Sequence, residues 1–219
     1  LAYEQIYGLQ GVETLVRGTL RGEGFCGGWD ALFQLGMNRD DAQLSLPEGT
    51  SWRAYTAGFA GGVGKDADRA QVRDAVAKTT GADHAALDLL DWLGLFEDDA
   101  VAPAQGSPCD ILQHRLESKW ALAPEDLDMI VMWHRFGYTT ADGEQRVRTS
   151  HLVHVGENDT HTAMSLTVGL PLALAARMWM RDEWKETGVI LPISPSLYKP
   201  LLRELAAEGI AFTENDSAL

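Results

Sequence analysis

The sequence predicts an α+β fold with a mixed or antiparallel sheet and an inserted all-helical subdomain. Period-two alternation, which is typical of a strand, occurs early, at residues 12–21, and returns late, from residue 128 onward. Residues 51–123 carry only helical signals, and the polar, turn-rich residues 37–50 precede them. A helical block therefore separates two stretches that can supply one sheet.

These observations divide the chain into three parts. We expect residues 1–36 to form the first part of the sheet domain, residues 37–124 the helical insert, and residues 125–219 the remainder of the sheet domain. No strand is followed by a Gly-x-Gly-x-x-Gly run, so a Rossmann domain is not expected within this chain. The first residue is Leu1 rather than Met, which suggests a fragment or a trimmed start.

The early part is expected to contain one strand and one helix. Alternation in the strand over residues 12–21 divides its side chains between two faces. One face carries Leu15, Arg17, Thr19 and Arg21, and the other carries Val16, Gly18 and Leu20. A helix from Trp29 to Leu35 follows, and Gly36 is the glycine expected to end it.

The helical block contains three further helices that the sequence delimits. Residues 66–78 form an amphipathic pattern. Asp83 is expected to cap a second helix that ends at Gly94, and Ser107 is expected to cap a third that contains Trp120.

The late part begins with a hairpin. Residues 128–136 and 145–155 read as strands, and Asp142-Gly143 between them is a turn dipeptide. A long apolar helix over residues 160–181 is expected to kink or break at Gly169-Leu170-Pro171, because proline removes a backbone donor. The tail then predicts strands over residues 189–193 and 210–213, with a helix over 195–207 between them.

Composition excludes several classes of protein. The 219 residues are 45% hydrophobic and 23% charged, which excludes a disordered chain. A formal net charge of −14 and a pI of about 4.7 argue against a nucleic-acid partner. The most apolar run, residues 164–180, contains Pro171 and Arg177 and falls short of the ~20 apolar residues of a membrane span, so we read a buried helix and no membrane partner. Two cysteines without metal or redox spacing favour a reducing, cytoplasm-like compartment.

Three motifs give only weak support for a functional site. Gly61-Gly62-Val63-Gly64-Lys65 lacks both the first glycine and the hydroxyl residue of a phosphate-binding loop, and it reads as a loop between helices. His151, His154, Asp159 and His161 are residue types that bind metals, but a metal site is not expected, because His151 and His154 point to opposite faces of a strand. Cys26 has no basic neighbour in sequence and is expected to be a small buried side chain rather than a nucleophile.

One histidine and four tryptophans are expected to have structural rather than functional roles. His134 is expected to be a solvated or hydrogen-bonded histidine near the end of its strand. Four tryptophans at helical positions are expected in the core or in an interface: Trp92, Trp120, Trp179 and Trp184.

The face that carries Arg17, Thr19 and Arg21 is the strongest candidate site. Two guanidinium groups and a hydroxyl lie along one side of an extended segment, and Gly18 permits close approach to its backbone. Arginine binds carboxylates in a bidentate manner, so an acidic ligand is one interpretation. Structural salt bridges within an acidic chain are the other.

The same residues resemble a known family. Val16-Arg17-Gly18-Thr19-Leu20-Arg21, followed by Gly24-Phe25, is similar to the central motif of the glutamate-forming saccharopine dehydrogenases, also called saccharopine reductases. Further segments follow in the family's order, and the match spans nearly the whole chain. They are Asp91-Trp92-Leu93-Gly94-Leu95, Asp128-Met129-Ile130-Val131 with His134, Asp142-Gly143, Thr167-Val168-Gly169-Leu170-Pro171, Gly188-Val189 and Tyr198-Lys199-Pro200-Leu201-Leu202.

The resemblance implies the C-terminal, substrate-binding and dimerisation portion of an oxidoreductase of lysine metabolism. In that family a separate N-terminal Rossmann domain binds NAD or NADP, and saccharopine is interconverted with glutamate and 2-aminoadipate 6-semialdehyde. The resemblance implies substrate contact for Thr19, Leu20 and Arg21, with Arg17 in support, and it assigns no catalytic, cofactor-binding or metal-binding residue to this chain. A homodimer in the cytoplasm is expected, with the mitochondrial matrix as the alternative, and the chain alone is expected to be inactive.

Two other functions remain open at this stage. One is a sister enzyme that acts on another carboxylated secondary amine, such as carboxynorspermidine. The other is a non-catalytic dimerisation module, whose sign would be Arg17 and Arg21 engaged in protein salt bridges with no pocket over them.

Overall fold

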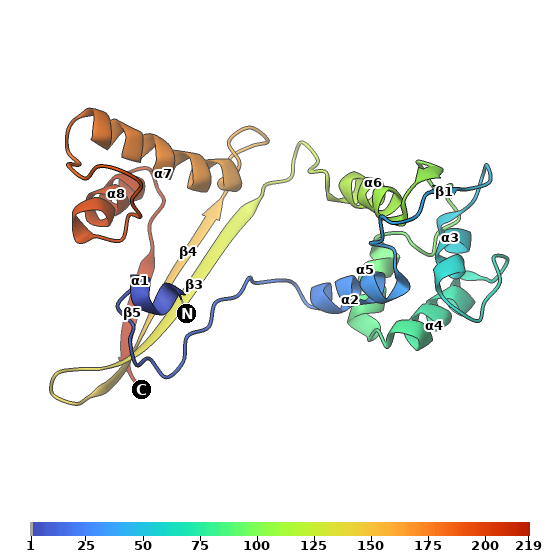
Figure 1. Ribbon diagram of the computed structural model, residues 1–219, viewed down its shortest axis with the longest axis horizontal. Coiled ribbons are helices and arrows are strands. Elements are labelled where there is room, and N and C mark those ends of the chain that lie inside the picture. The colour runs from blue at the N-terminus through green and yellow to red at the C-terminus, as the bar shows by residue number, and fades with distance from the viewer. Residues whose placement is uncertain (1) are drawn as a thin grey trace. The chain divides into compact units, whose positions relative to one another are not determined.

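A computed structural model describes residues 2–219, and in it the chain divides into two compact units (Figure 1). The first unit comprises Leu1–Glu13 and Leu122–Leu219, and the second comprises Thr14–Ala121. The chain combines helices with small antiparallel sheets, so the expected α+β class is confirmed.

The second unit is a cluster of helices around its own core. Its elements are α2 (Phe25–Leu35), β1 (Leu44–Ser45), α3 (Trp52–Phe59), α4 (Arg69–Thr80), α5 (His84–Trp92), β2 (Gln105–Gly106) and α6 (Pro108–Trp120). The two short strands pair antiparallel with each other, which the purely helical expectation for residues 51–123 did not include. The most deeply buried side chains include Trp52, Phe96, Met37, Val72 and Ile111. Burying each such side chain contributes about 1.5–3 kcal/mol, so this core holds the helices together.

Capping residues set the helix ends as the sequence predicts. The Asp83 carboxylate accepts a hydrogen bond from the Ala86 amide at 2.8 Å and starts α5. Ser107 and Asp110 form a reciprocal capping box that starts α6. Gly36 ends α2 with a φ of 79°, a left-handed conformation that glycine adopts without strain. α4 begins at Arg69, three residues later than the pattern suggests, because Asp68 caps it.

The predicted strand over residues 12–21 is wrong. Residues 14–22 form neither helix nor strand, and their side chains are exposed. Alternation favours an extended backbone, but a strand also requires a neighbour with which to exchange hydrogen bonds, and no ladder includes these residues. The helix that follows, α2, packs against α5 and α4, so residues 14–36 group with the helical unit rather than with the sheet.

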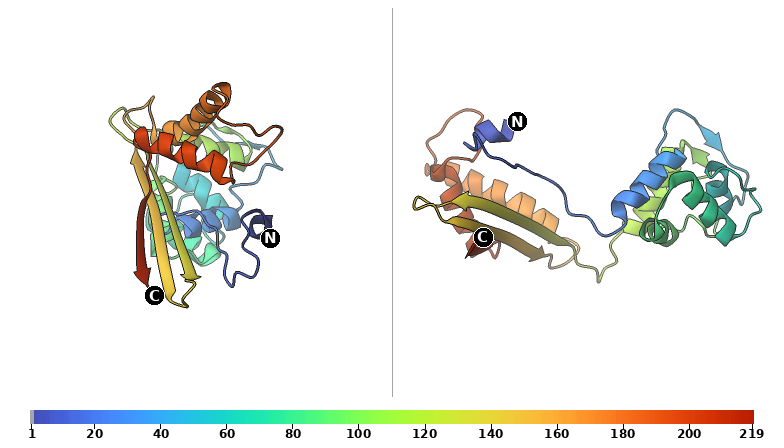
Figure 2. Two further views of the ribbon diagram at one scale, coloured as in Figure 1. Left: turned by 90° about the vertical axis from the view of Figure 1, so that its left-hand side faces the viewer. Right: turned by 90° about the horizontal axis from the view of Figure 1, so that it is seen from below.

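The first unit is a three-stranded antiparallel sheet with helices packed on it (Figure 2). β4 (Gln145–Val155) lies between β3 (Met129–Thr139) and β5 (Thr213–Ala218). α7 (Ala163–Met180) contacts β3 and lies beside α8 (Pro195–Ala207), and a short helix, α1 (Ala2–Ile6), opens the unit. The core of this unit is small: Leu152, Leu174, Leu205 and Ile210, with Leu170, Leu201 and Phe212 packed against them.

The hairpin of β3 and β4 is confirmed, whereas the tail differs from the prediction. Thr139 pairs with Gln145 across the turn, and Gly143 has a φ of 89°. Residues 189–193 form no strand, and the last strand occupies 213–218 rather than 210–213. The apolar pattern misplaces this strand because β5 is polar and is held by hydrogen bonds to β4 instead of by burial.

α7 continues through Pro171 as one helix, so a break does not occur there. Proline removes one backbone donor, and the helix continues because Leu174 and Met178 beyond it are buried against the unit. The expectation of a buried helix is also wrong, since Ala163, Leu174 and Met178 are the residues of α7 that are buried, and Met164 and Leu172 are exposed. By length and composition alone α7 could cross a membrane, and in this unit it packs against β3 and α8.

Candidate functional site

The motif residues lie together on the surface of the helical unit. Arg17, Thr19, Leu20 and Arg21 occupy the extended segment that leads into α2. All four are exposed, and Leu20 retains 66% of its accessible surface. The segment therefore offers backbone and side-chain donors to solvent without the rigid support of a sheet.

Arg21 is held by two local contacts. One terminal nitrogen, Nη1, donates a hydrogen bond to the Leu20 carbonyl at 2.9 Å, and the guanidinium carbon lies 5.2 Å from the centre of the Phe25 ring. Among residues 2–219, no carboxylate forms an ion pair with Arg21. Arg17, in contrast, already takes part in interactions within the chain.

Gly24 fixes the start of α2 directly behind the motif. It has a φ of 75°, and a side chain there would come within 2.8 Å of the Ala85 backbone. The Gly28 amide donates to the Gly24 carbonyl at 2.8 Å and closes the first helical turn. Because a larger residue does not fit between α2 and α5, glycine at this position sets where Phe25 lies.

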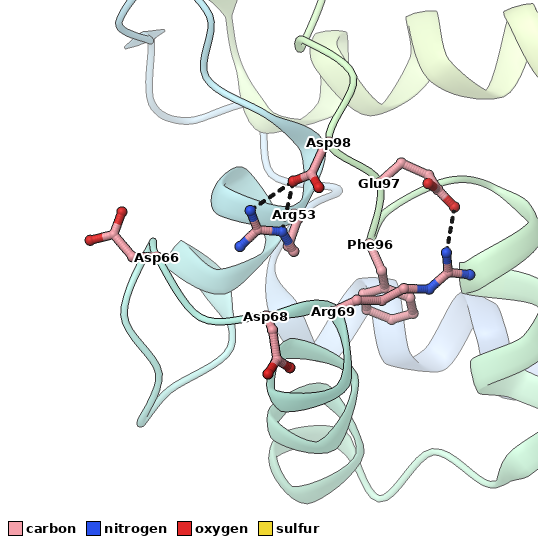
Figure 3. A pocket seen from close by; sticks show the side chains of 7 residues that line it. All are labelled: Arg53, Asp66, Asp68, Arg69, Phe96, Glu97 and Asp98. Carbon is pink, nitrogen blue, oxygen red and sulfur yellow. Dashed lines mark hydrogen bonds and ion pairs between the residues drawn. The ribbon is translucent and has the colours of Figure 1, made fainter.

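The cavity in Figure 3 is a different kind of site. It has a volume of about 270 Å³ and is bordered by Arg53, Arg69, Phe96 and four carboxylates, Asp66, Asp68, Glu97 and Asp98. Both arginines are engaged: Arg53 Nη2 lies 2.7 Å from Asp98, and Arg69 lies 2.7 Å from Asp91 and 3.0 Å from Glu97.

The ion pairs of this cavity join parts of the helical unit to one another. The hydrogen bond to Asp91 and the charges of Asp91 and Glu97 raise the pKa of Arg69 above its usual value. Arg53 also donates to the Ala67 carbonyl and so ties the loop before α4 to the segment after α5. Both arginines of the cavity are already paired with carboxylates, which favours a structural role over binding of an acidic ligand.

A larger, mainly apolar groove of about 640 Å³ lies elsewhere on the helical unit. Phe33, Leu44, Phe59 and Pro108 line it, and its most polar members, Arg39 and Asp41, are hydrogen-bonded to each other at 2.9 Å. That hydrogen bond is the largest cause of the raised pKa of Arg39 and of the lowered pKa of Asp41. The groove therefore presents no unpaired charge to a ligand.

The surroundings of several side chains differ in part from those expected, although His134 is exposed, as expected. Cys26 is exposed on α2 rather than buried. His134 lies in the middle of β3, where its ring is 6.1 Å from that of Phe136 and 5.8 Å from that of Phe212. Trp92, Trp120 and Trp179 each retain more than half of their surface, so they do not belong to the core.

The histidines near the end of β4 are separated by the sheet. His151 pairs with Trp133 and His154 with Ile130, so the two lie on opposite faces, as the strand spacing predicts. Across residues 2–219 the structure contains no group of three or more His, Cys, Asp and Glu side chains placed to hold a metal ion.

A nicotinamide dinucleotide does not fit the described residues. Its phosphates bind where a glycine-rich turn joins a parallel strand to a helix, and both sheets of residues 2–219 are antiparallel. The glycine-rich residues 61–65 join two helices, as expected, and follow no strand. The site geometry thus supports recognition of an anion by Arg21 and its neighbours and assigns no redox chemistry to them.

Comparison with known proteins identifies relatives over almost the whole chain. The profile of the family described as "Saccharopine dehydrogenase C-terminal domain" matches residues 1–210. The mitochondrial alpha-aminoadipic semialdehyde synthase of Bos taurus is 35% identical over 214 residues, which are 96% of this chain and 23% of that protein. The saccharopine dehydrogenase (NADP(+), L-glutamate-forming) of Saccharomyces cerevisiae is 33% identical over 211 residues, which are 93% of this chain and 46% of that protein.

A solved structure agrees with these relatives. Apo saccharopine dehydrogenase (L-Glu forming) from Saccharomyces cerevisiae superimposes with a TM-score of 0.85 at 30% sequence identity. The superposition covers 99% of this chain and 49% of the yeast chain. The chain therefore spans about a quarter of the synthase and about half of the dehydrogenase that it matches.

Proposed function

The chain belongs to the saccharopine dehydrogenase C-terminal domain family, and from this premise we propose that it is the substrate-binding and dimer-forming portion of an NAD(P)-dependent oxidoreductase. The proposed reaction, in lysine metabolism, interconverts saccharopine with glutamate and 2-aminoadipate 6-semialdehyde. The dinucleotide is held by a Rossmann domain outside residues 1–219, so this chain alone is inactive.

The observation that carries the proposal is the state of Arg21. The formal net charge of the protein is −14, so carboxylate partners for an arginine are plentiful. Arg21 nevertheless lies over Phe25 with no recorded ion pair among residues 2–219. Saccharopine carries three carboxylates, and an exposed guanidinium is the group best suited to bind one of them.

The other motif residues supplement this contact. The Thr19 hydroxyl can donate to or accept from a substrate polar group, Leu20 lies beside it, and Arg17 adds positive charge to the same segment. These residues bind and orient carboxylates. Hydride transfer and hydrolysis of the resulting imine are assigned to groups outside this set.

Dimerisation is proposed for the sheet unit. By the strand register, Met129, Val131 and Trp133 of β3 share one face with Val153 and Val155 of β4, and all five are exposed. Leu152, on the opposite face, packs in the core of the unit. A contiguous apolar face on a sheet supports an interface, here with a second copy, and sedimentation of the complete gene product measures its stoichiometry.

The compartment is proposed from relatives and composition. Reduced cysteines favour the cytoplasm, and the mitochondrial synthase among the relatives makes the mitochondrial matrix the alternative.

The deciding experiment is an activity assay of the complete gene product. Saccharopine-dependent reduction of NAD and of NADP is followed at 340 nm, with carboxynorspermidine as the competing substrate. Turnover of saccharopine supports the proposal and identifies the cofactor. Turnover of carboxynorspermidine alone would assign the protein to the sister enzyme activity. A folded dimer that turns over neither substrate would leave the non-catalytic dimerisation module as its function.

A further inference from the structure

Arg21 stands at one end of a row of aromatic rings on the helical unit. Its guanidinium carbon lies 5.2 Å from the Phe25 ring centre, and the Phe25 and Trp29 rings are 6.3 Å apart at 63°. Trp29 in turn lies 6.3 Å from Trp120 at 55°. Phe25 and Trp29 are one helical turn apart on α2, whereas Trp120 is the last residue of α6.

The row is anchored from both sides. At Gly24 the start of α2 lies close to Ala85, so that a Cβ atom added to Gly24 would come within 2.8 Å of the Ala85 backbone. On the other side, Trp120 supports Trp29 from a second helix. The Phe25 ring is therefore held by the packed helices, although the segment before it is neither helix nor strand.

A cation–π contact of this kind uses none of the N–H donors of a guanidinium in a hydrogen bond to a protein acceptor. The Arg21 guanidinium carbon lies over the Phe25 ring, and the group carries five N–H donors in its plane. One of these donors is used by the Leu20 carbonyl. The others can form the paired hydrogen bonds that a carboxylate accepts, and an arginine already ordered on a ring loses less side-chain freedom on binding.

We propose that Phe25, supported by Trp29 and Trp120, is a positioning residue that orients Arg21 for a substrate carboxylate. The inference rests on the proposed function, since it assumes that Arg21 contacts substrate. It adds that the geometry of this contact is provided by the helical unit through a row of aromatic rings.

The test is a double-mutant cycle in the complete gene product. Phe25→Leu removes the ring and is expected to raise the KM for saccharopine three- to tenfold, with kcat and the dinucleotide KM within twofold of the parent. Phe25→Tyr retains the ring and is expected to restore the KM. In an Arg21→Ala background, Phe25→Leu is expected to have no further effect. Phe33→Leu, at an exposed phenylalanine of the same helix, is the matched control.

The possible outcomes distinguish a failure of this inference from a failure of the proposed function on which it rests. Suppose that the parent turns over saccharopine. The positioning role is then overturned if Phe25→Leu leaves the KM for saccharopine unchanged, or if it changes the KM by the same factor in the Arg21→Ala background as in the parent. In either case the proposed function stands. If the parent does not turn over saccharopine, or Arg21→Ala leaves its KM unchanged, the assumed substrate contact itself fails. Should Phe25→Leu melt more than 10 °C below the parent, Trp120→Ala replaces it. That variant is expected to raise the KM two- to fivefold only when Arg21 is present, and no change would overturn the role.

Discussion

At the scale of single residues, the arginines of this chain fall into two groups. Arg53, Arg69, Arg115 and Arg146 each lie within 3.2 Å of a carboxylate oxygen. Such a guanidinium must release its partner before it can bind an acidic ligand. Within residues 2–219 Arg21 forms no ion pair, so a ligand carboxylate would displace no protein carboxylate there.

Replacing Arg21 by alanine is expected to weaken substrate binding specifically. Loss of one charge-assisted contact corresponds to about 1.5–3 kcal/mol, which is roughly a 10- to 150-fold rise in the KM for saccharopine. Affinity for the dinucleotide, measured by fluorescence titration, should not change. Arg203→Ala, at an exposed arginine of α8, is the control and should behave as the parent. An Arg21→Ala protein with the parental KM would remove Arg21 from the site.

The sequence predicts the motif residues but not their surroundings. Arg17, Thr19, Leu20 and Arg21 are identified by spacing and by family resemblance, and their role as substrate contacts stays a prediction. The i, i+4 spacing of Phe25 and Trp29 was available in the sequence as a signal for this part of the aromatic row. The contribution of Trp120 was not, because it comes from a separate helix that only tertiary packing brings close.

At the scale of elements, the hydrogen bonds of Asp128 join the start of β3 to the end of β4 and to the start of α7. The Asp128 carboxylate accepts hydrogen bonds from the Met164 amide at 2.9 Å and from the Ala163 amide, so it caps α7 from the start of β3. Gly156, at the end of β4, donates its amide to the Asp128 carbonyl at 2.9 Å. A Cβ atom on Gly156 would lie 2.7 Å from the Ala163 nitrogen. The absence of a side chain there allows the two strands and the helix to meet.

Gly156→Ala is therefore expected to destabilise the sheet unit by about 1–3 kcal/mol, a cost typical of overpacking. Urea unfolding followed by circular dichroism measures the change. Gly169→Ala is the matched control, because Gly169 is an exposed helical position of α7 with open space around it. That variant should gain up to about 1 kcal/mol from helix propensity. Equal unfolding midpoints for the two variants would contradict the role given to Gly156.

In addition to its backbone pairing with β4, the polar strand β5 is held by one carboxylate that contacts both β3 and β4. Asp216 accepts hydrogen bonds from the Tyr138 hydroxyl at 2.6 Å, from Arg146 at 2.7 Å and from Arg148 at 2.8 Å. These hydrogen bonds, that of Tyr138 foremost, hold the pKa of Asp216 well below its usual range. Stability from such a depressed carboxyl is present above the ordinary value of about 3.9 and is lost as the pH falls below it.

Pairing of β5 with β4 is therefore expected to weaken as the pH falls below about 4. Amide hydrogen exchange of residues 213–218 measures this. Asp216→Asn should expose these amides at neutral pH and abolish the dependence, whereas Glu214→Gln, a neighbour on the same strand, should retain it. Protection of β5 that is independent of pH in the parent would exclude Asp216 as its attachment.

Helices and the hairpin could be predicted, whereas isolated strands could not. Asp83, Ser107 and Gly143 act within a few residues of themselves, so their capping and turn signals are local. Residues 12–21 and 189–193 carry strand patterns but have no neighbouring strand, and β5 has a neighbour but no apolar pattern. Pairing is a property of two segments, and one segment alone does not encode it.

At the scale of the whole molecule, the two units differ in the size of their cores. The helical unit buries Trp52, Phe96 and many aliphatic side chains, whereas the sheet unit buries only a small cluster around Leu152. Stability is therefore expected to be unequal, with the sheet unit opening first.

Residues 14–121 expressed alone are expected to fold cooperatively. A domain of about 100 residues should show an unfolding enthalpy near 60–80 kcal/mol by calorimetry. Residues 122–219 alone are expected to melt at a lower temperature and less cooperatively. A non-cooperative transition of residues 14–121 would show that the helical unit depends on the remainder of the chain.

The sheet unit is discontinuous, because Leu1–Glu13 precedes the helical unit and Leu122–Leu219 follows it. On the ribosome, residues 2–13 emerge long before the strands of their own unit exist. At about 5–20 residues per second, they wait roughly 10–40 s for the last strand to be synthesised. The helical unit is complete well before that time. Translation therefore imposes an order on folding, with the motif-bearing unit formed first and the sheet assembled afterwards.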